Sequence, residues 1–397
     1  MDELEFDDVL DDWFIESLKT YRDLHVYQLE HPTQVIEWTS EKTVCVAGCS
    51  LKKNEILELR LPLRLFAEEN KGLCAERDFK VVHGGFTDGP VRCLRHIPGT
   101  RCLVTNDGLS AELQLWGLGG DDSNVIRRTG SIEGSRSVLE CGSRIAVRDS
   151  SRPQVLHGAQ SSGVQLTELS SGQMLYKLDT DAADPLSSLQ FVSDSVFLAS
   201  CCNGNIYVAD TRTSAAPQLY PPPACSGESV FWWTDASSGP DLSGCKVIRL
   251  SSSGQAMVSD LRSLEGAVSQ AHLDIQACHH GLDVVRVSWA PVLDNCIALS
   301  GFSGAVHIYD TSVWTTELQE AQLLFEHRGH VVSLQSEDAV PVFITSHVWH
   351  PDRPRTLLSA ASDGSVHVWD WVDQSGTRAE VNKLKGSVHP TLTCGAV

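Results

Sequence analysis

The chain has 397 residues, an ordinary apolar share of 42% and a formal net charge of −20. It can bury a large core, but its acidic surface repels phosphate backbones and disfavours direct binding to nucleic acids or anionic membranes. The 13 cysteines are an odd number at irregular spacing, and neither a signal segment nor an apolar run approaching a membrane span is seen, so we expect a soluble protein of the cytosol or nucleus with mostly reduced thiols.

Residues 1–23 are expected to form an acidic segment followed by an amphipathic helix. Seven acidic side chains fall in residues 1–12, and residues 10–21 then change to helical spacing. The apolar positions of that helix make one stripe: Leu10, Phe14, Leu18 and Tyr21. The stripe predicts that the helix covers one mouth of the fold. In the alternative reading, Trp13 or Ile15, which lie off the stripe, faces a partner.

A long mixed segment follows the strand expected at 54–61. It reads "PLRLFAEENKGLCAER", residues 62–77, and separates that strand from the next one at 78–86. Apolar groups beside arginine are typical of interface anchors. The candidate partner-binding residues are therefore Arg64, Phe66, Lys71 and Arg77, together with Trp13 and Phe14 of the helix. The alternative is that the apolar side chains pack onto the edge of their own sheet.

A short unit recurs along the chain in degenerate form. Its clearest copy is "AASDGSVHVWDW", residues 360–371, in which Asp363-Gly364 signals a tight turn and an alternating apolar strand follows. The other copies are "SGFSGAVHIYDT", "SSSGQAMVSDLR", "SCCNGNIYVADTR", "TNDGLSAELQLWGL", "GAQSSGVQLTELS" and "GCSLKKNEILELRL". Seven such units predict a repeat architecture.

The last unit resembles the WD-repeat family. Gly329-His330 is followed by a strand, by the turn at Asp363 and by Trp369-Asp370. The resemblance implies an all-β fold, a seven-bladed β-propeller over residues 24–372, with 373–397 as a flexible tail. The strand expected at 24–30 precedes the first repeat, and we expect it to pair antiparallel with 365–371 and close the ring, which removes two exposed edges.

The family's structural tetrad joins a histidine, a serine or threonine, an aspartate and a tryptophan. His330, Asp363 and Trp369 match three of its members, and the hydroxyl position falls on Ala361, so the network is expected to be incomplete. We interpret Trp369 as a structural residue that packs between blades with its indole N–H bonded to a polar neighbour, and not as a functional site.

Motifs for catalysis or cofactor binding were not found in the sequence. No Gly-rich phosphate loop and no Gly-x-Ser-x-Gly elbow occur. Cys278-His279-His280 is the nearest candidate metal cluster, but adjacent residues converge poorly on one ion. A basic patch formed by Lys52, Lys53, Arg60 and Arg64 is interpreted as solvated charges. We expect no enzyme activity, no cofactor and no metal.

Further stretches are similar to one branch of the WD-repeat family: "DDWFIESL", "SLKKNEILELRLPLRL", "ENKGL", "SWAP" and "HPDRPRTLLSA". This resemblance implies a non-catalytic scaffold that supports assembly of the Integrator RNA-endonuclease module and microtubule organisation in dividing cells. The implied partners are the Integrator endonuclease-module subunits, a HEAT-repeat protein and tubulin-associated proteins. The implied locations are the cytoplasm, the spindle pole and cleavage furrow in dividing cells, and also the nucleus.

Two other functions are compatible with parts of the sequence. The first is a substrate receptor of a cullin–RING ubiquitin ligase, because such receptors carry Trp-Asp-x-Arg at a strand end. Here "ADTR" keeps Asp210 and Arg212, and "SDLR" keeps Asp260 and Arg262, both without the tryptophan. These arginines also fit simple salt bridges within a blade. The second is an enzyme built on a propeller, which requires acidic or histidine side chains around the central channel.

Overall fold

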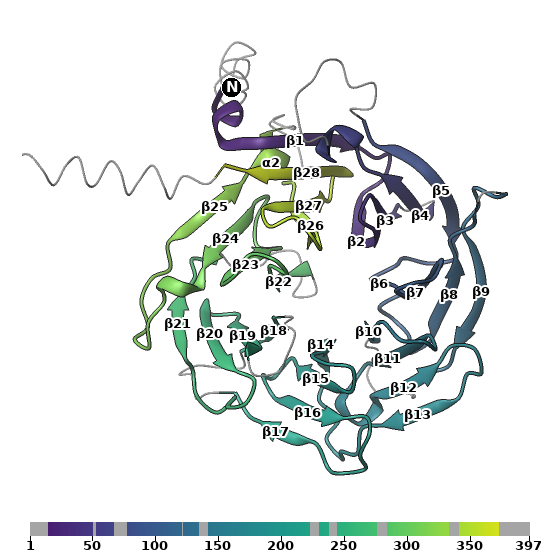
Figure 1. Cartoon of the computed structure of the whole chain (residues 1–397), viewed down its shortest axis with the longest axis vertical. Coiled ribbons are helices and arrows are strands. Elements are labelled where there is room, and N and C mark those ends of the chain that lie inside the picture. Colours follow the sequence, from purple (N-terminus) through teal and green to yellow (C-terminus); the bar gives the residue numbers. More distant parts are fainter. Residues whose placement is uncertain are drawn as a thin grey trace, which may run out of the picture.

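The computed structural model describes residues 15–50, 53–66, 78–120, 122–134, 142–222, 230–237, 244–275, 284–332 and 341–372. These residues form seven four-stranded sheets arranged as blades around a common axis (Figure 1). The fold is therefore the seven-bladed propeller that the repeats predicted. None of the helices in the described ranges has the length and apolar composition needed to cross a membrane.

In each blade the first strand lies nearest the axis and the later strands lie progressively outward (Figure 1). Blades 1 to 3 consist of β2 (Thr33–Ser40), β3 (Thr43–Cys49), β4 (Asn54–Arg60) and β5 (Lys80–Thr87); β6 (Cys93–His96), β7 (Cys102–Asn106), β8 (Leu113–Gly117) and β9 (Arg127–Ile132); and β10 (Arg144–Val147), β11 (Gln154–Gly158), β12 (Gln165–Glu168) and β13 (Met174–Lys177).

Blades 4 to 6 consist of β14 (Leu186–Phe191), β15 (Val196–Cys201), β16 (Ile206–Asp210) and β17 (Gln218–Tyr220); β18 (Trp232–Ala236), β19 (Lys246–Ser251), β20 (Gln255–Asp260) and β21 (Ser269–His272); and β22 (Arg286–Trp289), β23 (Cys296–Ser300), β24 (Val306–Asp310) and β25 (Leu323–His327). Short helical elements are η1 (Leu63–Phe66), η2 (Ser161–Gly163), η5 (Thr311–Val313) and α2 (Gly329–Val332).

Blade 7 is assembled from both ends of the chain. It holds β26 (Ile344–Trp349), β27 (Thr356–Ala361), β28 (Ser365–Trp371) and, as its outermost strand, β1 (Tyr21–Gln28). β1 pairs antiparallel with β28, with Leu24 opposite Trp369. The predicted ring closure is confirmed, although the strand expected at 24–30 begins earlier, at Tyr21. Tyr21 therefore does not belong to the helical stripe, because the described helix covers residues 15–20 only.

The turns within blades follow from glycine. In blades 4 to 7 the hairpin between the second and third strands contains a glycine with a positive φ: Gly204, Gly254, Gly301 and Gly364, at 90°, 91°, 97° and 88°. Residues other than glycine rarely adopt this backbone conformation. A Cβ on Gly364 would also lie 2.8 Å from the backbone oxygens of Leu29 and His31. The small-residue turns seen in the repeats are thus a backbone requirement.

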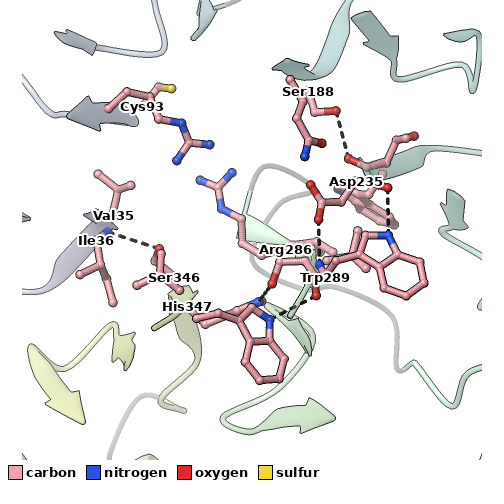
Figure 2. A pocket seen from close by; sticks show the side chains of 18 of the residues that line it. Val35, Ile36, Cys93, Ser188, Asp235, Arg286, Trp289, Ser346 and His347 are labelled. Carbon is pink, nitrogen blue, oxygen red and sulfur yellow. Dashed lines mark hydrogen bonds between the residues drawn. The ribbon is translucent and has the colours of Figure 1, made fainter. Parts of the chain in front are cut away.

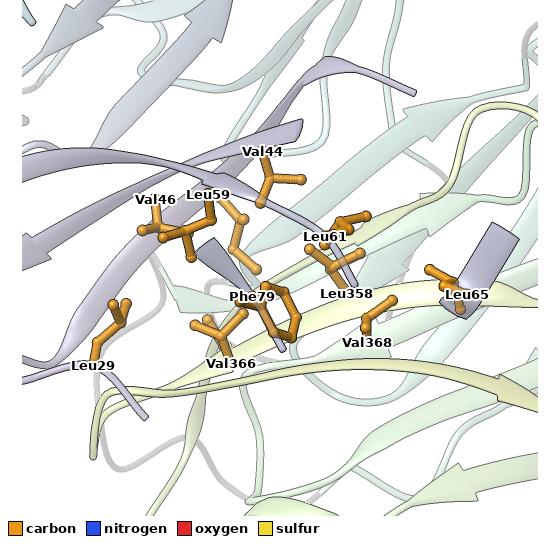
Figure 3. Close-up of a cluster of buried hydrophobic side chains, with 12 residues drawn as sticks. Leu29, Val44, Val46, Leu59, Leu61, Leu65, Phe79, Leu358, Val366 and Val368 are labelled. Carbon is orange, nitrogen blue, oxygen red and sulfur yellow. The ribbon is translucent and has the colours of Figure 1, made fainter. Parts of the chain in front are cut away.

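The core lies between neighbouring blades, and Figure 3 shows the cluster that joins the last blade to the first. Leu358, Val366 and Val368 of blade 7 pack against Val44 and Leu59 of blade 1, and all five are fully buried. Burying one such side chain contributes about 1.5–3 kcal/mol. The ring is therefore closed by hydrophobic packing as well as by the β1–β28 ladder.

Candidate interaction site

The tetrad-like network of blade 7 is complete. Trp369 Nε1 donates to Ser359 Oγ at 3.2 Å, and Ser359 Oγ lies 2.8 Å from His330 Nε2. His330 Nδ1 lies 2.6 Å from Ser365 Oγ, which donates to Asp363 Oδ1 at 2.6 Å. The assignment of the hydroxyl position to Ala361 was wrong. Leu357 and Ser359 pair with Trp369 and His367, so Ser359 lies beside the indole.

Two further histidines extend this network to the ring closure. His327 Nδ1 is 2.7 Å from the Tyr21 hydroxyl, and its Nε2 is 3.1 Å from His367 Nδ1. Burial lowers the pKa of His367 to about 3; burial, with His367 nearby, also lowers the pKa of His327 and His330 well below the usual range. All three imidazoles are therefore neutral at physiological pH.

The ligand atoms of His327, His330 and His367 lie within 4.8 Å of one another, which raises the question of a metal site. Both nitrogens of His330 already contact serine hydroxyls. Its ring also stacks on His367 at 3.7 Å and 11°, so the in-plane lone pairs of the two rings do not converge on one point. The arrangement fits a structural hydrogen-bond cluster better than a metal centre.

The central channel contains a cavity of about 400 Å³, walled by the innermost strands (Figure 2). Its charged lining includes Arg95 on β6, Asp235 on β18 and Arg286 on β22. Arg95 keeps 40% of its side chain exposed and bonds Glu37 Oε2 at 2.8 Å. Asp235 accepts a hydrogen bond from the Trp289 amide at 2.8 Å. Guanidinium groups of this kind suit the binding of an acidic side chain.

Burial raises the pKa of Asp235 to about 7, although two backbone amides and the charge of Arg95 oppose the shift. His347 lies close to Ser288, with its Nε2 2.7 Å from the hydroxyl, as in a nucleophile–base pair. However, its Nδ1 contacts the Ser300 hydroxyl instead of a carboxylate, and burial lowers its pKa to about 3. The imidazole is thus a weak base, and the pair is better suited to holding blades 6 and 7 together.

The segment at 62–77 divides at η1. Leu65 is 2% exposed and packs in the cluster of Figure 3, and its carbonyl accepts a hydrogen bond from Arg353 of blade 7. Arg64 is half-buried. The start of the segment therefore packs at the junction of blades 1 and 7. For Leu65 this agrees with the alternative of packing on the fold, but the contacts are not confined to the edge of its own sheet. The side chain of Phe66 and the candidates Lys71 and Arg77 lie outside the described residues.

The described part of the N-terminal helix exposes apolar side chains. Leu18 is 68% exposed and Ile15 is 53% exposed, and Val372, whose amide bonds the Thr20 carbonyl at 2.9 Å, is 42% exposed. Leu18 was expected to pack on the fold, and for this residue that expectation was wrong. Trp13 and Phe14 lie outside the described residues. We call Ile15, Leu18 and Val372 the terminal apolar patch.

The Asp-x-Arg pairs form salt bridges within their own strand ends. Arg212 Nη2 lies 2.6 Å from Asp210 Oδ2, and Arg262 Nη2 lies 2.6 Å from Asp260 Oδ2. Lys53 similarly lies 3.0 Å from Glu55. The Asp-x-Arg contacts match the interpretation as simple salt bridges within a blade, and the Lys53 contact matches the interpretation of the basic patch as ordinary surface charges. Lys52 lies outside the described residues.

The charges of the channel were missed by sequence reasoning. Arg95, Asp235 and Arg286 stand in the short apolar strands "CLRH", "WWTDA" and "RVSW". Charged side chains are rare in strands that are largely shielded from solvent, as these three are. That signal was present, but only the ring geometry shows that the innermost strands bring these residues to one cavity.

The chain was compared with known proteins. No family model matches it. A protein of Danio rerio named Integrator complex assembly factor WDR73 is 50% identical over 372 residues, which are 92% of this chain and 98% of the relative. Proteins of the same name from Mus musculus and Homo sapiens are each 41% identical, over 92% and 93% of this chain and 99% of each relative.

Proposed function

The chain belongs to the Integrator complex assembly factor WDR73 family, and from that premise we propose that it is a non-catalytic scaffold for assembly of the Integrator RNA-endonuclease module. The observation behind this proposal is the identity of 41–50% over about nine-tenths of the chain to relatives that bear this name. The alignments cover 92–93% of the chain, so most of the propeller is shared with these relatives. The proposed partners are the endonuclease-module subunits and a HEAT-repeat protein.

The terminal apolar patch is the proposed contact for these partners. Exposed apolar groups that lie together are typical of protein-binding surfaces. Ile15, Leu18 and Val372 adjoin the ring closure, where the β1–β28 ladder gives a rigid support. The remaining candidates on the helix and the 62–77 segment are proposed to extend this contact: Trp13, Phe14, Arg64, Phe66, Lys71 and Arg77.

Affinity purification from cytosol with quantitative mass spectrometry tests the proposal. We expect the unsubstituted chain to recover the endonuclease-module subunits, and the Ile15→Asp, Leu18→Asp double variant to recover several-fold less at an unchanged melting temperature. The matched control is Met174→Asp, Leu219→Asp, because these side chains are 51% and 50% exposed on the outer strands of blades 3 and 4. Equal losses in both double variants would contradict the assigned surface.

A second double variant tests the proposed contact of the 62–77 segment. Arg64→Ala with Phe66→Ala is expected to reduce recovery of the same subunits while the chain stays folded. If both folded double variants recover the subunits fully, the contact lies on another face of the ring. If the unsubstituted chain recovers none of them, the proposed scaffold role is wrong.

We further propose a cytoplasmic location with spindle-pole association in dividing cells, through tubulin-associated proteins. The family resemblance supports this proposal. Imaging of the tagged chain through mitosis tests it, and a signal that never concentrates at the poles would contradict it. The acidic net charge of −20 favours an indirect link, because the protein surface repels acidic polymers.

A further inference from the structure

Arg249 is a buried cation in the wall between two blades. It lies on β19 of blade 5 and is 3% exposed. Val247, two residues earlier on the same strand face, packs against Leu198 of blade 4. Because side chains alternate along a strand, Arg249 also faces blade 4.

The guanidinium group has one protein acceptor within the described residues. Nη1 donates to the Pro221 carbonyl at 3.0 Å. Nε and Nη2 are buried, and no described residue accepts a hydrogen bond from either. Burial lowers the pKa of Arg249 to about 10, so the group still carries its positive charge at neutral pH.

Other unsatisfied groups face the same interface. Thr234 stands directly opposite Arg249 in the β18–β19 ladder, and its buried hydroxyl has no partner in the described structure. The buried hydroxyl of Ser200 on blade 4 likewise has no hydrogen-bond partner in the described structure. Ser200 on β15 pairs with Ser188 on β14. The Ser188 hydroxyl donates to the Thr234 carbonyl on β18 at 3.0 Å, so β14 of blade 4 contacts β18 of blade 5 beside these groups.

Comparison with blade 7 shows how unusual this position is. Arg249 precedes the turn glycine Gly254 by five positions, and Ser359 precedes Gly364 by the same number. In blade 7 the small Ser359 is satisfied by His330 and Trp369. Blade 5 places a charged side chain at that point, and the neutral network is replaced by a cation.

A buried charge without a counter-charge is strongly unfavourable, far more than one lost neutral hydrogen bond. The unsatisfied groups here are a guanidinium and hydroxyls that can donate, which suits an acceptor with negative charge. The low exposure of Arg249 leaves no access for an organic ligand. We propose that the interface between blades 4 and 5 holds a small inorganic anion of about the size of chloride against the Arg249 guanidinium.

Thermal unfolding of the full chain in sodium chloride and in sodium gluconate at equal ionic strength tests the site. Gluconate is too large for the interface, and an ion that binds only the folded state raises the melting temperature. We expect the melting temperature in 100 mM chloride to be about 2 °C or more above that in gluconate. Arg249→Met should abolish this difference. Arg95→Met should keep it, because Arg95 already pairs with Glu37.

Bromide provides a direct readout on the unsubstituted protein, and so does not depend on whether the variants fold. Crystals grown in bromide should show an anomalous peak within hydrogen-bond reach of Nε or Nη2 of Arg249. Equal melting temperatures in the two salts, a chloride effect that survives Arg249→Met, or a carboxylate in place of the peak would each overturn the proposal. Glu228, outside the described residues, is the carboxylate to examine, and Glu228→Gln should leave the chloride effect unchanged.

Discussion

The hydroxyl of Tyr21 lies 2.7 Å from Nδ1 of His327, and 306 positions of chain separate the two residues. Tyr21 begins the strand that closes the ring, and His327 ends the outer strand of blade 6. A neutral His327 accepts from the tyrosine through Nδ1 and donates through Nε2 to His367 Nδ1. The contact therefore ties the closing strand to blade 6 and to β28 together.

The donor and acceptor of each hydrogen bond in the blade 7 network can be assigned. Ser365 donates to the Asp363 carboxylate, so its oxygen accepts from His330 Nδ1–H. His330 Nε2 then accepts from the Ser359 hydroxyl, whose oxygen accepts from the Trp369 indole. This assignment requires a neutral His330, because its Nε2 must accept a hydrogen bond. The lowered pKa of His330 agrees with this requirement.

Trp369 is expected to be a stability residue. It is fully buried, and Trp369→Ala should lower the free energy of unfolding by about 3–5 kcal/mol through cavity formation and lost packing. Denaturant titration measures this, with Phe86→Ala as control, because Phe86 is 71% exposed and should change stability by about 0.5 kcal/mol or less. Partner binding should fall only with the unfolded fraction. A well-folded variant that loses one partner selectively would show Trp369 to be a binding residue.

Removal of the Tyr21 hydroxyl should weaken ring closure. Tyr21→Phe leaves a buried nitrogen of His327 without its partner, which costs about 1–3 kcal/mol. Equilibrium unfolding gives the value. Tyr220→Phe is the control, because that hydroxyl bonds Gln218 on an exposed edge. Equal effects in the two variants would mean that the Tyr21 contact adds nothing to stability.

The buried histidines predict loss of stability in acid. Burial lowers the pKa of His367 to about 3 in the folded chain, whereas an unfolded histidine titrates near 6.5. The unfolded state therefore binds more protons below pH 6.5, and stability falls as pH decreases from about 6.5 towards 3. Between pH 7.5 and 5.5 one such histidine accounts for a loss of about 1.4 kcal/mol.

The variant His367→Asn should reduce the loss between these two pH values by that amount, whatever its effect on stability at pH 7.5. Unfolding titrations at both pH values measure it. His272→Asn, at a side chain that is 40% exposed, is the control and should leave the difference unchanged. If His367→Asn loses as much stability in acid as the unsubstituted chain, His367 is protonated in the folded state.

Two neighbouring leucines test how the 62–77 segment is attached. Leu65 is 2% exposed and Leu63 is 39% exposed. Leu65→Ala should therefore cost about 2–5 kcal/mol of unfolding free energy, and Leu63→Ala much less. Chemical denaturation of both variants gives the comparison. A small effect of Leu65→Ala would mean that η1 detaches from the cluster shown in Figure 3.

Much of the architecture could be predicted from the sequence because it depends on local patterns. Turn glycines such as Gly364 mark blades 4 to 7, and the alternating strands mark the repeats. A strand left over before the first repeat has one obvious partner in a closed ring. The resemblance to the WD-repeat family placed His330, Asp363 and Trp369 in one structural network, where the chain holds them.

What remained depended on register and on packing across blades, which no local pattern encodes. The pairing of β27 with β28 decided that Ser359, and not Ala361, reaches Trp369. The ring brought Asp235 and Arg95 into one channel and left Arg249 facing blade 4 without a charged partner among the described residues. Local patterns therefore specify the blades. Side-chain burial is set by distant segments, so packing between blades selects which polar groups are buried together and which apolar groups, such as Leu18, stay exposed.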